Sequence, residues 1–313
     1  MTGANFLVET EENGERHRFL VDCGLEQAGR ICPESNFAPF AYDPASVEAL
    51  FVTHGHLDHV GRIGKLMKDG FKGKIYSTPP TKDIAELIML DSLGVMAKER
   101  RGTDRPPLYD PKDVAAAMRV WETFPYHEPV RLGALQAVFR DAGHILGSSM
   151  VEFTLADRKL LFTGDLGNSP MPLLPDTEEI SDIDYLLIES VYGDRNHEAK
   201  AERAMMMRKV IKDTMLAGGT LMVPAFSVER TQELLFEIEN MMANSEIPLV
   251  PVFVDSPLAI AVTAVYKKYH NYFKKSVAAT VRATDGAIFQ FPQLHFTKTT
   301  EESKSINNEP ARK

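Results

Sequence analysis

The chain has 313 residues, enough for two ordinary domains, and hydrophobic residues make up 44% of it, a fraction typical of soluble globular proteins. Its net charge of −9 excludes a surface coated in basic charge for wrapping nucleic acid, but not a local basic groove. Two cysteines make no disulfide framework, no apolar run reaches the roughly 18 residues that cross a bilayer, and the N-terminus lacks a signal peptide's features, so we expect a cytoplasmic protein.

Residues 6–9 and 17–21 predict a pair of strands joined by a polar turn at 11–15. The second strand ends at Asp22. A lone carboxylate in this position is typical of loop capping, but the nearby histidines favour a second role. In that role Asp22 orients a metal ligand through a hydrogen bond.

The densest cluster of metal-ligating side chains is the run Thr53-His54-Gly55-His56-Leu57-Asp58-His59. A buried strand is predicted at 47–52 and a helix from residue 60, so the cluster lies on a turn where side chains can converge. Zinc accepts imidazole nitrogen and carboxylate oxygen when no thiolate is offered. His54 and His56 can therefore face one ion, while Asp58 and His59 can serve a second. A polar loop of incidental histidines is the competing interpretation, which this density of ligands disfavours.

The next segment predicts structure around this turn. A strand at 74–77 stops at two prolines, after which Thr81 is expected to cap a helix. Asp110 and Pro111 are expected at the first positions of another helix.

Later strands are also predicted to end in Asp, His or Glu. Residues 135–139 lead to His144, a hairpin at 151–155 and 159–162 leads to Asp165, and residues 185–188 lead to Glu189. Together these ends indicate one rim of a sheet that carries an active site. We take His54, His56 and His144 as one zinc site and Asp58 with His59 as the start of another, with Asp165 between the two ions. Such a pair makes a water molecule reactive at neutral pH, which is metal-assisted hydrolysis of a phosphodiester, a thioester or a lactam.

The pattern changes from about residue 198. Strands at 220–223 and 249–254 alternate with helices at about 204–215, 230–242 and 258–269, which predicts an α/β unit with a doubly wound sheet. We place the boundary near residue 196, with a metal-binding domain at 1–196 and a partial second domain at 197–313. The tail from residue 299 is polar and has no core-forming pattern.

The motifs LVDCG, THGHLDH, AGHILGSS and FTGDLGN resemble the metallo-β-lactamase superfamily. The segments LLIESVYGDRNH, PAFSVERTQELL, VDSPLA and LHFTKTTEESKSIN resemble its β-CASP branch, which includes ribonuclease J and the endonuclease of the polyadenylation machinery. The resemblance implies an αββα sandwich with a β-CASP cap domain and single-stranded RNA bound between them. Glutamate rather than aspartate at position 189 is similar to the members that act on RNA.

The resemblance also implies roles for individual residues. Asp22 is the orienting carboxylate, and Glu189 helps to position a catalytic histidine. Asp58 and Asp165 are catalytic as well as ligands. The zinc ligands that the resemblance implies are His54, His56, Asp58, His59, His144 and Asp165, and the expected substrate contacts are Ser148, Tyr192 and Arg230.

Family members ordinarily continue into strands that carry two further histidines. We therefore expect this chain to be a fragment with an incomplete second zinc site, an incomplete sandwich, low stability and weak or no turnover. The leading hypothesis is a zinc-dependent hydrolase of RNA, with two ions in the full-length protein, no membrane association and a homodimeric assembly. Two alternatives stay open: a small-molecule hydrolase that acts on a thioester, and a non-catalytic scaffold that holds an active partner.

Overall fold

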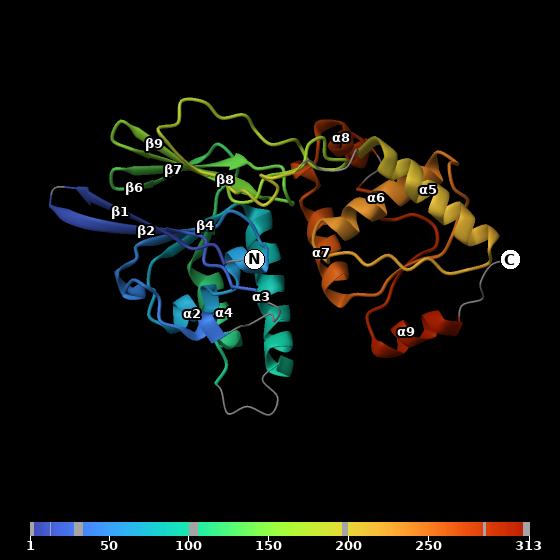
Figure 1. Cartoon of the computed structure of the whole chain (residues 1–313), viewed down its shortest axis with the longest axis horizontal. Helices are drawn as coiled ribbons and strands as arrows, with labels where there is room; N and C mark the ends of the chain where they lie inside the picture. The colour runs from blue at the N-terminus through green and yellow to red at the C-terminus, as the bar shows by residue number, and fades with distance from the viewer. Residues whose placement is uncertain are drawn as a thin grey trace. The chain divides into compact units, whose positions relative to one another are not determined.

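The computed structural model describes residues 3–12, 14–27, 34–99, 106–195, 200–283 and 286–308. Contacts divide the chain into two compact units, residues 1–189 and 190–313 (Figure 1). The boundary that we predicted near residue 196 lies outside the described residues and stays a prediction.

The described part of the first unit contains two five-stranded sheets. The first sheet has the order β1-β2-β3-β4-β5, in which β1 and β2 form the predicted antiparallel hairpin and β2 to β5 run parallel. The second has the order β10-β9-β8-β7-β6 and is antiparallel except where β10 runs parallel to β9. The strands are β1 (Phe6–Glu12), β2 (Glu15–Val21), β3 (Ala49–Phe51), β4 (Lys74–Ser77), β5 (Trp121–Thr123), β6 (Pro129–Leu132), β7 (Leu135–Asp141), β8 (Ser149–Leu155), β9 (Arg158–Phe162) and β10 (Tyr185–Leu187).

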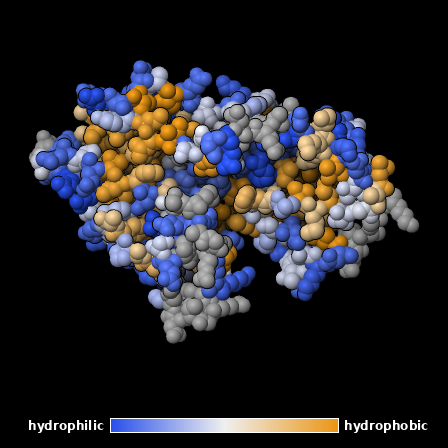
Figure 2. Space-filling view, in the orientation of Figure 1, coloured by the Kyte–Doolittle hydropathy of each residue, from blue (hydrophilic) through white to orange (hydrophobic). Residues whose placement is uncertain are grey.

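The central strands of the first sheet are buried on both faces. Because side chains alternate along a strand, Phe19 and Phe51 pack against residues of the second sheet, while Leu20 and Leu50 pack against the helices. Figure 2 shows hydrophobic residues gathered between the two layers of strands. The helices and helical turns of this unit are η1 (Glu34–Phe37), η2 (Pro44–Ser46), α1 (Leu57–Val60), α2 (Ile63–Lys68), α3 (Pro79–Glu99) and α4 (Pro111–Val120).

Helices cover only one of the two sheets within the described residues. On the outer face of the second sheet, Met150 and Leu161 pack against Leu166, Ile180 and Ile183, which belong to an irregular segment. The described part of the unit is thus an α/β sandwich with helices against one sheet and an irregular segment against the other. The incomplete sandwich that we expected stays a prediction.

The predicted helix starts are right at one position and wrong at two. Asp110 caps α4 with Pro111 in its first turn, and Asp113 completes a capping box. Thr81 is not an N-cap, because α3 already begins at Pro79, where proline's missing N–H costs no helical hydrogen bond. The helix that we expected from residue 60 begins at Leu57.

The second unit combines helices with a two-stranded parallel sheet of β11 and β12. The strand that we predicted at 220–223 is wrong: this segment has no strand neighbour among the described residues, and Met222 is 86% exposed. Without a ladder of hydrogen bonds, high β-propensity does not make a strand. The elements are α5 (Lys200–Leu216), α6 (Arg230–Ala243), β11 (Val252–Val254), α7 (Pro257–Lys268), η3 (His270–Tyr272), α8 (Lys275–Ala283), β12 (Leu294–Phe296), α9 (Thr300–Ser305) and η4 (Ile306–Asn308).

In the described part of either unit, no helix combines the length and the apolar character that crossing a bilayer requires.

Candidate metal centre

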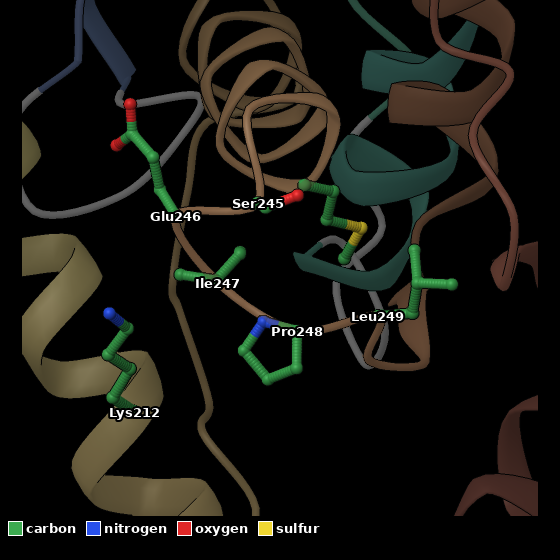
Figure 3. A pocket seen from close by; sticks show the side chains of 7 residues that line it. Lys212, Ser245, Glu246, Ile247, Pro248 and Leu249 are labelled. Atoms are coloured by element: carbon green, nitrogen blue, oxygen red, sulfur yellow. The ribbon is translucent and has the colours of Figure 1, made fainter.

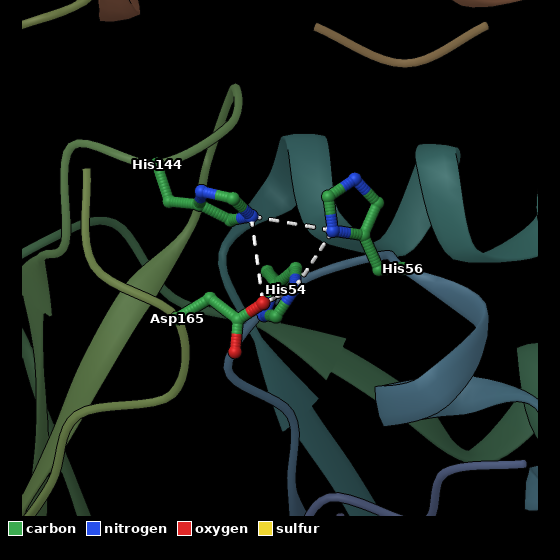
Figure 4. Close-up of side chains that lie close together, drawn as sticks. All are labelled: His54, His56, His144 and Asp165. Carbon is green, nitrogen blue, oxygen red and sulfur yellow. Dashed lines mark hydrogen bonds and ion pairs between the residues drawn. The ribbon is translucent and has the colours of Figure 1, made fainter. Parts of the chain in front are cut away.

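The predicted ligands come from three strand ends of the first unit. His54 and His56 follow β3, His144 lies in the loop between β7 and β8, and Asp165 follows β9. Because α1 begins at Leu57, Asp58 and His59 fall in its only turn and are buried. Figure 4 shows the side chains of His54, His56, His144 and Asp165 pointing toward one another.

Three imidazole nitrogens meet at one point. His54 Nε2 lies 3.1 Å from His56 Nδ1, which lies 3.3 Å from His144 Nε2. Nitrogens bound at about 2.0–2.1 Å to a tetrahedral zinc ion are separated by about 3.3 Å, so these spacings suit one ion. Asp165 Oδ2 stands 3.8 Å from His54 Nε2 and 3.7 Å from His144 Nε2, which adds an oxygen to the set. In the described part of the chain these four residues are the one group that could hold a metal ion.

The second oxygen of Asp165 faces His59 and not the three-histidine group. Its Oδ1 lies 3.2 Å from His59 Nε2, so one carboxylate faces the three-histidine group with one oxygen and His59 with the other. The role of Asp165 between two ions stays a prediction. Asp58 is buried nearby, but it does not belong to the four-residue group.

Asp22 and Thr53 fix which ring nitrogens are available. Asp22 Oδ2 accepts hydrogen bonds from Thr53 Oγ1 at 2.8 Å and from His59 Nδ1 at 2.7 Å, while its Oδ1 accepts from the Thr53 backbone N–H at 2.8 Å. Since the Thr53 hydroxyl donates to Asp22, His54 Nδ1 donates to Thr53 Oγ1, 3.1 Å away. The Nε2 atoms of His54 and His59 are thereby left for a metal. Thr53 lies inside the motif that we singled out, yet we assigned it no role, because only the fold brings Asp22 to it.

Burial sets the charge of the three-histidine group. It lowers the pKa of His56 to about 4 and, together with the neighbouring His56 ring, that of His144 to about 4. Burial is the largest cause, and the neighbouring His59 the next, of a pKa of His54 that lies well below its usual range. All three imidazoles are therefore neutral at neutral pH, so an ion can bind without displacing protons from them.

His59 has the opposite charge preference. Burial by itself lowers its pKa, but Asp22 and the hydrogen bonds to Asp165 and Asp22 outweigh this and raise the pKa to about 10. Burial opposes ionisation of Asp165 as well, yet its hydrogen bond to His59 brings the pKa of that carboxyl below its ordinary value. Burial raises the pKa of Asp58. A metal ion that binds His59 Nε2 must therefore displace a proton.

The His144 loop is held by Ser148, which we expected to contact the substrate. Ser148 is fully buried, and its Oγ accepts hydrogen bonds from the backbone N–H groups of His144 at 3.0 Å and Ile145 at 3.1 Å. The hydroxyls of Thr78 and Thr81 both donate to the carbonyl of Gly147, at 2.6 and 2.8 Å. Gly147 has φ +78°, and a Cβ there would lie 2.7 Å from Pro80, so only glycine fits.

Glu189 lies beside the loop that carries Asp165. Its Oε1 accepts a hydrogen bond from the Leu166 backbone N–H at 2.6 Å, and its own backbone N–H donates to Thr163 Oγ1 at 3.2 Å. The structure thus connects Glu189 to the Asp165 loop, and its predicted contact with a catalytic histidine stays a prediction.

The remaining predicted substrate contacts lie in the second unit. Tyr192 is 51% exposed, with the Arg195 guanidinium 5.4 Å from its ring centroid. Arg230 pairs with Glu233 at 2.8 Å and with Glu229 at 3.8 Å. The substrate contacts predicted for Tyr192 and Arg230 stay predictions.

The second unit also has a pocket of about 430 Å³, which Figure 3 shows at the side of α5. Its charged groups are Lys212 and Glu246, and Glu246 forms an ion pair with Arg208. No histidine or cysteine lines it, so it contributes nothing to the candidate metal centre. The lining residues are Lys212, Met242, Ser245, Glu246, Ile247, Pro248 and Leu249.

Comparisons with known proteins agree with the geometry. The model of the metallo-beta-lactamase superfamily matches residues 3–198, and that of the Beta-Casp domain matches residues 231–313. The chain is 36% identical to a ribonuclease of Thermus thermophilus over 94% of this chain and 65% of the relative. It is 33% identical to a transcription termination factor of Methanosarcina mazei over 85% of this chain and 42% of the relative. It is 32% identical to an RNase J-like protein of Methanocaldococcus jannaschii over 96% of this chain and 66% of the relative. The chain thus spans less than two thirds of each of these relatives.

Proposed function

The chain belongs to the metallo-β-lactamase superfamily, in its β-CASP branch, and on this premise we propose that it serves a zinc-dependent enzyme that hydrolyses phosphodiester bonds of RNA. The observation that carries the proposal is the meeting of His54, His56, His144 and Asp165 from three loops at ligand distances. The names of the relatives, among them a ribonuclease and an endoribonuclease, support RNA as the substrate.

We propose two ions for the full-length protein, the second of which this chain binds only in part. Nitrogens of His54, His56 and His144 would hold the first, His59 and Asp58 would contribute to the second, and Asp165 would contact both. Bound zinc supplies Lewis acidity, which lowers the pKa of a water molecule and offsets negative charge on the phosphate. Nitrogen and oxygen donors in this geometry support zinc, which we propose as the metal.

The chain's own residues then orient this chemistry. Asp22 keeps the proton of His59 on Nδ1 and so directs Nε2 toward Asp165. Ser148 and Glu189 hold the loops that carry His144 and Asp165. The burial that lowers the pKa of His56 and His144 keeps these ligands neutral, and it also strengthens electrostatic interactions with a charged substrate.

Two features argue against the alternatives. A thioester hydrolase would use the same metal ligands, but the match of residues 231–313 to the Beta-Casp domain supports a nuclease. A scaffold that had lost activity would be expected to lack ligands, whereas the six predicted ones are present. We further propose that the protein is cytoplasmic, a proposal supported by the free, buried Cys23, and that it forms a homodimer.

The test is cleavage of a labelled single-stranded RNA by the zinc-loaded full-length protein and by its variant Asp165→Asn. We expect this variant to lose at least about a thousandfold in rate, because one neutral amide replaces the shared carboxylate. The matched control is His127→Gln, which changes a 58% exposed histidine outside the metal group. Equal rates for wild type and Asp165→Asn, or faster hydrolysis of a thioester than of RNA, would refute the proposal.

A further inference from the structure

One segment of the second unit departs from the acidic character of the chain. No acidic residue occurs between Asp255 and Asp285, although the whole chain carries 44 acidic against 35 basic residues. Residues 267–284 of this segment hold five basic residues and two tyrosines. The basic residues are Lys267, Lys268, Lys274, Lys275 and Arg282.

The fold gathers these cations around one corner. Lys267 and Lys268 are the last residues of α7, and Lys275 is the first of α8, which Figure 1 labels in the second unit. The single helical turn η3 connects the two helices. Packing of Tyr266 against Phe273, with ring centroids 6.3 Å apart, holds the end of α7 beside the start of α8.

Helix α8 directs its charges outward. Ala278 and Val281 are buried against the unit, whereas Lys275 and Arg282 are exposed. Because these two cations are seven residues apart, they lie two turns apart on the same exposed stripe of the helix. A row of positive charge therefore continues from the corner along α8.

Aromatic rings lie among the cations. Tyr269 and Tyr272 are partly exposed and pack edge to face, with ring centroids 6.1 Å apart. The Lys268 ammonium lies 4.8 Å from the centroid of Tyr269. Basic groups interleaved with aromatic rings are the composition that binds single-stranded nucleic acid, since phosphates pair with the cations and bases stack on the rings.

The exposed cations of α8 are not neutralised by ion pairs within the part of the chain that the structure describes. These cations are Lys275 and Arg282. Glu239 interacts electrostatically with Lys267, but its carboxylate also accepts hydrogen bonds from the backbone N–H groups of Phe289 at 2.9 Å and Gln290 at 3.3 Å.

We propose that the surface formed by Lys267, Lys268, Lys274, Lys275 and Arg282 with Tyr269 and Tyr272 binds the backbone of single-stranded RNA outside the metal centre. The inference rests on the proposed function for the choice of RNA as the polyanion. An anionic membrane fits less well, because the apolar side chains of α8 are packed inside the unit and leave no apolar face to insert.

The experiment compares the double variant Lys268→Gln/Lys275→Gln with Lys72→Gln/Lys112→Gln, which removes two exposed lysines from the first unit. Binding of a labelled single-stranded RNA is titrated over a range of salt concentrations in the presence of a chelator, so that the RNA stays intact. We expect the salt slope of the first variant to fall by about 1.4 relative to wild type, since each lost phosphate contact lowers it by about 0.7. The slope of the control variant should match wild type.

The outcomes separate this inference from the proposed function. A wild type that cleaves RNA, with equal slopes for both variants, would overturn the surface and leave the function intact. A slope that falls as expected, together with a full-length protein that cleaves no RNA, would support the surface and overturn the function. Loss of binding to phosphatidylserine vesicles in Lys268→Gln/Lys275→Gln, with RNA binding unchanged, would assign the surface to membranes instead.

Discussion

At the scale of single residues, the surroundings give chemically identical side chains different charges. Burial keeps His56 and His144 neutral, whereas the carboxylates of Asp22 and Asp165 favour a protonated His59. These preferences divide the candidate centre into a group that is ready for an ion and a group that must first lose a proton. Residue identity alone predicted the ligands but could not predict this division.

Asp22→Asn tests whether Asp22 orients His59. The neutral amide is a poorer acceptor for His59 Nδ1–H, so we expect metal binding at His59 to weaken about 10–100-fold while the three-histidine group keeps its affinity. Isothermal titration of the metal-free protein measures both affinities. The control is Asp43→Asn, because Asp43 caps a turn at Ala45 and asparagine caps equally well. Two unchanged affinities in Asp22→Asn would show that the orientation of His59 does not depend on Asp22.

Asp141 should make stability depend on pH. Burial raises the pKa of this carboxyl to about 6, so the folded chain keeps a proton that the unfolded chain releases at lower pH. The associated stability is present below about pH 4 and is lost as pH rises through about 6. The shift corresponds to about 3 kcal/mol at neutral pH. In urea unfolding, the free energy of unfolding of Asp141→Asn should therefore rise relative to that of wild type as the pH increases from about 4 to neutral. The expected total change is about 3 kcal/mol. A constant difference across the range would contradict it.

At the scale of elements, the ends of strands and the loops after them carry the candidate centre. Regular patterns predicted the hairpins and α4 well, because alternation and capping are local properties. They failed at 220–223, where strand propensity finds no partner, and at Thr81, where Pro79 already starts the helix. The local sequence pattern could not predict that Ser148 is buried either, because its burial depends on how the loop that carries His144 folds.

Ser148→Ala tests whether the Ser148 hydroxyl fixes the conformation of the loop that carries His144. Removing the hydroxyl leaves the backbone N–H groups of His144 and Ile145 without their acceptor, so His144 should be less well placed and the first zinc ion should bind about 10–100-fold more weakly. Cobalt substituted for zinc allows the affinity and the visible spectrum to be followed together. The matched control Ser92→Ala removes another buried hydroxyl, which donates to the Met89 carbonyl. If both variants lose stability and neither changes metal affinity, Ser148 supports the fold alone.

At the scale of the whole molecule, the centre exists only in the folded first unit. His144 is 88 positions from His56, yet their nitrogens lie 3.3 Å apart. An ion that binds this arrangement and not the unfolded chain must stabilise the fold.

Zinc should therefore raise the melting temperature of the first unit. At about one hundred times the dissociation constant the expected gain is about 2.7 kcal/mol, or several degrees for a unit of this size. Scanning calorimetry with and without zinc measures the shift, and the transition of the second unit should stay in place. His56→Gln should abolish the shift and His127→Gln should preserve it. An equal shift in His56→Gln would place the stabilising ion elsewhere.

The sequence by itself determined which side chains could bind metal, the strand ends on which they lie, and the α/β class of both units. It could do so because ligand chemistry belongs to residue types, and side-chain periodicity belongs to short segments. Only the tertiary structure decided that His144 and Asp165 reach the turn that bears His54 and His56, which nitrogen each histidine presents, and which ligands are neutral. These properties depend on the packing of the two sheets and on burial, and both depend on contacts between distant segments.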